Sequence, residues 1–93
     1  MAVTGEVAAR SELRYTPAGL ERIEIKLAHQ SVQQHAGNPR QVRFELNALA
    51  LGELARQAAG LRPGDRVKLE GFLAPRSLNS TQLVLQIDNI TLE

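Results

Sequence analysis

The chain has 93 residues, 43% of them hydrophobic, and its 11 basic and 10 acidic side chains leave a net charge of +1. This apolar content excludes general disorder, and the length predicts a single domain spanning residues 1–93. The absence of cysteine excludes disulfides, thiolate catalysis and thiolate metal sites. A charge balance so close to zero means that composition alone does not indicate a nucleic-acid ligand.

Targeting signals are not apparent in the sequence. No apolar run approaches the roughly 20 residues of a membrane helix. The segment from Met1 to Glu6 lacks a basic stretch followed by an apolar one, so it does not read as a signal peptide. We therefore expect a cytoplasmic protein.

Three strands are predicted in the first half of the chain. Apolar residues alternate with polar ones over residues 3–13, 23–27 and 42–50, and the polar stretch 30–34 extends the second strand. Residues 14–19 contain a proline and a glycine placed for a turn. Residues 35–39 read as the next loop.

The pattern changes to a helical one at Gly52. Apolar residues from 51 to 58 have helical spacing, and Gly60 is a natural helix terminator. A fourth strand follows over residues 67–73, where Gly71 predicts a bulge or a tight bend, and a polar loop covers residues 74–81. The fifth strand begins at residue 83 and continues irregularly to residue 92.

This order of elements predicts an all-β fold, a five-stranded OB-fold barrel with a short helix between strands 3 and 4. Closing the sheet removes unpaired strand edges, and the helix would plug one open end of the barrel. The closure itself is inferred by analogy with known folds.

Three parts of the sequence resemble the primosomal replication protein N (PriB) family, which is related to bacterial single-stranded DNA-binding proteins. They are Arg14–Gly19, then His29–Gly37 with the following Arg40-Gln41, and Gly64–Val67 with Gly71–Ala74. The resemblance implies a homodimer that binds single-stranded DNA and assists the primosomal helicase in replication restart. It implies neither catalytic activity nor a cofactor.

Six residues are candidates for nucleic-acid binding: Arg14, Tyr15, Lys26, Arg40, Arg43 and Arg76. The cations would neutralise phosphates, because Lys26 and Arg43 share the parity opposite to the core and strands two and three are expected to pair. An alternative is that Lys26 and Arg43 form surface ion pairs with Glu24 and Glu45, each worth about 0–1 kcal/mol.

Aromatic residues are scarce where bases would stack. Better-known family members carry aromatics where this chain has Asn38 and Arg43, and several lysines in the final loop, where this chain has Arg76. We therefore expect weak binding of single-stranded DNA and a greater dependence on protein partners. Tyr15 is either a stacking platform or a ring packed over Pro17.

Other apolar residues have simpler interpretations. Phe44 has the core parity and is expected in the core, whereas Phe72 has the opposite parity unless Gly71 shifts the register. An exposed Phe72 would indicate a dimer contact. Leu49 and Leu51 either cover the barrel end or join an interface between subunits.

Catalytic and metal sites are not predicted. His29 and His35 lack a ligand spacing, and a triad of His29, Ser31 and Asp88 lacks a nucleophile elbow. Two alternatives to the primosomal role remain open. One is a stand-alone single-stranded DNA-binding protein, disfavoured because the sequence ends at Glu93 without an acidic tail. The other is a protein-interaction module without DNA binding.

Overall fold

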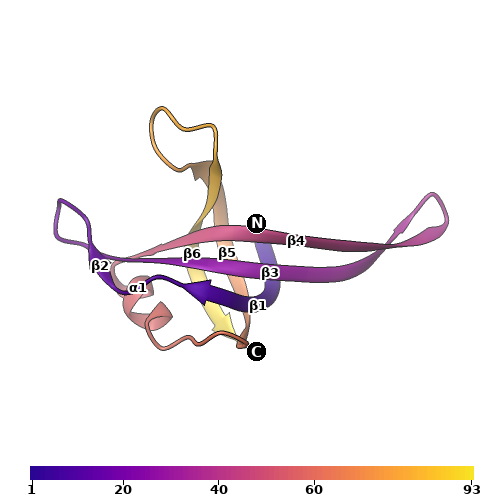
Figure 1. Ribbon diagram of the computed structural model, residues 1–93, viewed down its shortest axis with the longest axis horizontal. Coiled ribbons are helices and arrows are strands. Elements are labelled where there is room, and N and C mark those ends of the chain that lie inside the picture. The colour runs from indigo at the N-terminus through magenta and orange to yellow at the C-terminus, as the bar shows by residue number, and fades with distance from the viewer.

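The computed structural model describes residues 1–93 and consists of six strands and one short helix (Figure 1). The elements are β1 (Ala2–Arg10), β2 (Arg14–Tyr15), β3 (Glu21–His35), β4 (Asn38–Leu51), α1 (Glu53–Ala58), β5 (Arg66–Pro75) and β6 (Leu83–Leu92). None of these elements is a helix of sufficient length and apolar character to span a membrane.

Five of the strands close into a barrel. The sheet order β1-β5-β6-β4-β3 is completed by pairing between β1 and β3. All neighbours are antiparallel except β4 and β6, which run parallel where Ala48 faces Leu85. The OB-fold barrel with its helix between the third and fourth barrel strands is thus confirmed. β2 lies outside the ring and pairs only with β3, so Arg14 and Tyr15 form a strand and not part of a turn.

The core follows the predicted alternation. Ile23, Ile25 and Leu27 on β3 are fully buried, as are Val67 and Leu69 on β5. On β3 and β5 every second side chain therefore faces the interior, as expected for a half-buried strand, whereas β6 buries the consecutive residues Val84 and Leu85.

The helix closes one end of the barrel through two small residues. Ala55 and Ala58 on α1 are fully buried and belong to the core cluster, which confirms the predicted plug. A helix of six residues is unstable by itself, so packing must hold it in place.

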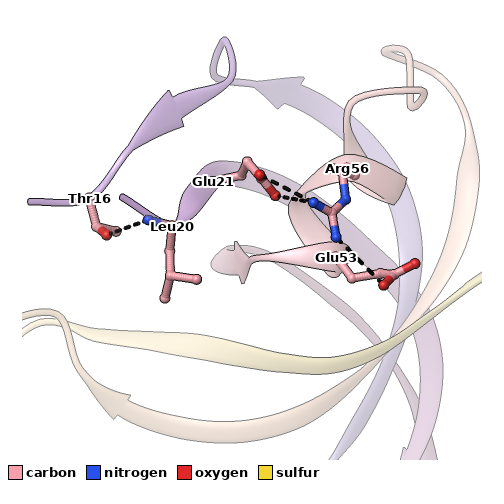
Figure 2. Close-up of polar contacts among 5 residues, drawn as sticks. All are labelled: Thr16, Leu20, Glu21, Glu53 and Arg56. Carbon is pink, nitrogen blue, oxygen red and sulfur yellow. Dashed lines mark hydrogen bonds and ion pairs between the residues drawn. The ribbon is translucent and has the colours of Figure 1, made fainter. Parts of the chain in front are cut away.

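An ion pair ties α1 to the start of β3 (Figure 2). The Nη1 atom of Arg56 donates to both carboxylate oxygens of Glu21, at 2.9 and 3.2 Å, and Nη2 lies 3.6 Å from Glu53. Just before β3, the backbone N–H of Leu20 donates to the Oγ1 atom of Thr16. Because the Arg56 side chain is 59% exposed, the pair orients the helix more than it stabilises the fold.

Two glycines allow strands to approach closely where the barrel curls. A Cβ atom on Gly5 would lie 2.3 Å from the backbone oxygen of Ala28, and one on Gly71 would lie 1.8 Å from that of Gln86. The register of β5 against β6 shifts between Glu70 and Gly71, so the predicted irregularity is present, but the extra residue is Asp88 on β6 and not a residue of β5. Both contacts are with backbone, so neither neighbour can move aside cheaply.

Beyond the barrel, β3 and β4 continue as a two-stranded ribbon, residues 29–44, here called the arm. It accounts for the long axis of the molecule, 50 Å against 31 and 18 Å for the others, and is plain in Figure 1. The turn at its tip consists of Ala36 and Gly37, both with positive φ, as in a tight hairpin. The expected loop over residues 35–39 is therefore a two-residue turn between longer strands.

Candidate nucleic-acid interface

The side of β3 and β4 that points away from the core is here called the outer face. Opposite residues in an antiparallel pair project to the same side, so the register defines the face. Its members are Arg22, Glu24, Lys26, Ala28 and Gln30 on β3, with Leu51, Leu49, Asn47, Glu45 and Arg43 opposite them on β4. The strands pair through the turn at Gly37, as expected.

Two of the predicted cations, Lys26 and Arg43, lie on the outer face with unpaired charges. Both residues are exposed, and neither has a carboxylate oxygen within 4.0 Å. The alternative that they pair with Glu24 and Glu45 is wrong, since Glu24 takes a different partner and Glu45 has none. These two positive charges are therefore free to meet a phosphate.

Arg76 reaches the same face but is already engaged. Its Nη1 atom lies 2.5 Å from Oε1 of Glu24, and the two side chains are 31% and 30% exposed. The Nε atom of Arg76 is buried without a hydrogen-bond partner. The charge of Arg76 is thus compensated by Glu24, and its structural effect is to hold the β5–β6 connection against β3.

Arg40 lies on the other side of the arm. It is opposite Gln33, and both share the parity of the buried positions on their strands. The structure therefore does not bring Arg40 together with Lys26 and Arg43.

Arg14 and Tyr15 lie at the end of β3 opposite to the arm. Arg14 faces Arg22 and Tyr15 faces Glu21, so the outer face ends in two adjacent arginines. Like charges placed opposite each other repel, which favours an anion between them. Tyr15 is 66% exposed, but it is opposite Glu21, which has the parity of buried Ile23, so its ring projects to the side away from the outer face. Arg22 was missed at the level of the sequence, although its parity with Lys26 was a usable signal.

Phe44 is not in the core, contrary to expectation. It is 40% exposed and stacks on the ring of His29, with centroids 4.8 Å apart. The parity was predicted correctly, but β1 pairs with β3 only as far as Ala28, so no strand pairs with β3 on this edge along the arm and Phe44 stays exposed. His29 is held by the backbone oxygen of Thr4 at 2.6 Å and by the Oγ atom of Ser31 at 3.0 Å.

The remaining apolar residues behave largely as predicted. Phe72 points away from the side of buried Leu69 and Gly71 and is 55% exposed. Leu49 and Leu51 are half-buried beside the helix end of β4. No group of three or more histidine, aspartate and glutamate side chains is arranged to hold a metal ion.

Two hollows open on the outer surface. A smaller one, about 150 Å³, is lined by Lys26 and Asn47 together with Ala9, Arg10, Ser11 and Glu24. A larger one, about 490 Å³, lies where the arm leaves the barrel and is here called the junction hollow. It is lined by Glu6, Ala28, His29, Gln30, Arg43 and Arg66.

Comparison with known proteins assigns the family. A family model described as "Another single-strand binding protein family" matches residues 1–89. The replication restart protein PriB of Nitrosomonas europaea is 40% identical over 85 residues, which cover 91% of this chain and 79% of the relative. The chain belongs to the PriB family. PriB of Bordetella pertussis is also 40% identical, over 81% of this chain and 70% of the relative.

Solved structures of PriB and related proteins share the fold. PriB from Ralstonia solanacearum superposes with a TM-score of 0.87 at 29% identity, over 100% of this chain and 95% of that one. The single-stranded DNA-binding protein from Thermus aquaticus gives 0.81 at 25% identity, over 99% of this chain and 48% of that one. The PriB barrel is therefore the same architecture as the barrel of a single-stranded DNA-binding protein.

Proposed function

We propose that this protein binds single-stranded DNA on its outer face and acts without catalysis, in the cytoplasm, in replication restart. The observation that carries the proposal is the pair of unpaired cations, Lys26 and Arg43, on one face of a barrel shared with a single-stranded DNA-binding protein. The names of the PriB relatives support the replication restart role.

The path of the strand follows the length of β3 and β4. Arg14 and Arg22 stand at one end, Lys26 in the middle and Arg43 on the arm, all on the same side. Phosphates would meet these cations, whereas Tyr15 projects to the other side of the sheet and is left out of the path. Arg40 and Arg76 are left out of this path because one faces away and the other is paired.

Affinity should be weak. Stacking contributes about 1–3 kcal/mol for each base, and no aromatic side chain projects from the outer face. Arg43 can stack by its guanidinium plane, but with less contact area than a large aromatic ring. A submicromolar dissociation constant for a short oligonucleotide at physiological salt would contradict this part of the proposal.

The first test is fluorescence anisotropy with labelled single- and double-stranded oligonucleotides at several salt concentrations. We expect preferential binding of the single strand, weakening as salt rises, with a slope of about −0.7 for each phosphate neutralised. Absence of binding at low salt would remove DNA from the function and leave a protein adaptor.

A role in contacting other primosome proteins, including the primosomal helicase, is the second part of the proposal. The scarcity of aromatic residues on the outer face favours it, because DNA alone would hold the protein weakly. A titration of the helicase with this protein, with and without single-stranded DNA, tests it. Binding of the helicase that is independent of DNA is the expected result.

We also propose that the protein is a homodimer joined through the arm. Phe44 is 40% exposed and stacks on the half-buried ring of His29, on the side of the arm that continues the core. Phe44→Glu should convert the dimer to a monomer in size-exclusion chromatography with light scattering, because a charge in an apolar contact is costly. Leu78→Glu, at a fully exposed loop position, is the matched control and should stay dimeric. A monomeric wild-type chain would refute the proposal, and dissociation by Phe72→Glu alone would place the contact on β5.

A further inference from the structure

The junction hollow forms because two strands part. β1 pairs with β3 as far as Glu6 and Ala28, and from there toward Ala2 it pairs only with β5. β3 meanwhile runs out into the arm. The hollow of about 490 Å³ lies in the angle between them, within the size range of sites for small ligands.

The register places five of its six lining side chains in two rows on the same surface; the sixth, His29, has the opposite parity. Arg66, Glu6 and Ala28 stand directly opposite one another on β5, β1 and β3. Gln30 and Arg43 form the next row on the arm. Because Ala28 carries only a methyl group, the centre of the hollow is open between a carboxylate and two guanidinium groups.

All three charged groups around the hollow lack protein partners. Arg43 and Arg66 are exposed and form no ion pair, and the Glu6 carboxylate forms neither an ion pair nor a hydrogen bond. Two guanidinium groups favour phosphates, whereas an ionised carboxylate only accepts hydrogen bonds. A complementary ligand must therefore present anions at its margins and adjacent N–H donors at its centre.

Among the DNA bases, guanine satisfies this requirement best. Its Watson–Crick edge carries an N1–H and an N2 amino group side by side, which match the two oxygens of a carboxylate. Thymine has a single N–H between two carbonyls, and adenine and cytosine place a ring-nitrogen acceptor beside their amino group. A carboxylate meeting such acceptors is left partly unpaired, which lowers affinity.

We propose that the junction hollow binds one guanine of a single DNA strand, with Glu6 accepting from N1–H and N2–H and with Arg43 and Arg66 contacting the phosphates on either side. The proposal deepens the proposed function and rests on it for the DNA strand. It adds Arg66, on β5, to the phosphate path, and it makes Glu6 the residue that determines base preference.

The test compares a labelled thymine-only oligonucleotide with the same oligonucleotide carrying one central guanine, by anisotropy. The guanine oligonucleotide should bind about fivefold more tightly, at the lower end of the discrimination that a bidentate contact provides. Replacing that guanine by inosine, which lacks the N2 amino group, should remove most of the gain.

Variants assign the preference to the hollow. Glu6→Gln should abolish it without weakening binding to the thymine oligonucleotide, since a negative charge near the phosphates is removed. Glu12→Gln removes the same charge from the exposed β1–β2 connection and should keep the preference. Ala28→Val narrows the centre of the hollow with a residue that suits a strand, and the preference should decrease.

A second measurement separates this proposal from the proposed function. Deoxyguanosine monophosphate should shift the backbone amide signals of Glu6, Ala28 and Arg66 in an NMR titration, and thymidine monophosphate should not. Equal affinity for both oligonucleotides would overturn the guanine site while leaving DNA binding intact. Failure to bind either oligonucleotide, with the guanine nucleotide still shifting those signals, would overturn DNA binding and leave the site. Failure in both experiments would overturn both.

Discussion

Replacing Gly71 with alanine is expected to destabilise the protein by about 3 kcal/mol, the largest effect of any single methyl group we foresee. The new Cβ atom would lie 1.8 Å from the backbone oxygen of Gln86 and 3.1 Å from the Cα atom of Ile87. Relief requires β5 and β6 to separate at the bulge, where the ladder turns from one register to the next. Thermal unfolding followed by circular dichroism should show the melting temperature fall by at least about 10 °C.

Gly60→Ala is the matched control for this experiment. At Gly60 the nearest atom to an added Cβ is the backbone oxygen of Gln57 at 3.6 Å, an ordinary contact distance. Its melting temperature should stay close to that of the wild type, with a change in stability within about 0.5 kcal/mol. Equal melting of the two variants would show that β5 and β6 can separate at little cost.

Reversing the two free cations of the outer face is expected to reduce affinity for single-stranded DNA more than tenfold. Lys26→Glu/Arg43→Glu replaces attraction to two phosphates by repulsion, and the dependence of log affinity on log salt should flatten by about 0.7 for each phosphate no longer neutralised. Both residues are exposed, so the fold should be preserved. Anisotropy across a salt series gives the affinity and the slope together.

Arg40→Glu/Arg62→Glu is the control with the same change in net charge. Arg40 lies on the opposite side of the arm, and Arg62 is exposed in the connection between α1 and β5. This pair should lower the affinity modestly, through the overall field, and leave the slope nearly unchanged. An equal decrease in both double variants would show that net charge, and not the outer face, drives binding.

The strands could be predicted because apolar and polar residues alternate along a half-buried strand, and this pattern is visible in a few consecutive residues. The buried run Ile23, Ile25, Leu27 and the irregularity beside Gly71 were both predicted from such local patterns, although the extra residue of the bulge, Asp88, is on β6. The length of the arm could not be read in this way. Its residues bury little, and the hairpin depends on backbone pairing and on the positive φ of Ala36.

Phe44 shows the limit of periodicity most clearly. Alternation tells which side of a strand a residue occupies, whereas exposure depends on whether another strand covers that side. Coverage here ends where β1 stops pairing at Ala28, a long-range fact set by the register of β1 and β3. The sequence therefore predicted the side correctly and the environment wrongly.

The residues of the candidate site also fall into two groups, those that a local pattern predicts and those that depend on long-range contacts. Lys26 and Arg43 share a strand pair and were predicted to share a face, which the register confirms. The partner of Arg76 is Glu24, 52 positions away in the chain, and no local pattern links them. Arg66 joins Arg43 at the junction hollow only because β1 lies between β5 and β3.

The order of strands around the barrel also has a consequence for synthesis on the ribosome. β1, β3 and β4 emerge first and can form a meander, since a two-residue turn joins β3 to β4 and residues 11–20, which include β2, join β1 to β3. The edges they leave open are filled by β5, which pairs with β1, and by β6, which pairs with β4. Until those last strands emerge, the apolar side of Ile23, Ile25 and Leu27 stays exposed to solvent. The nascent chain is therefore prone to aggregate until β5 and β6 close the barrel.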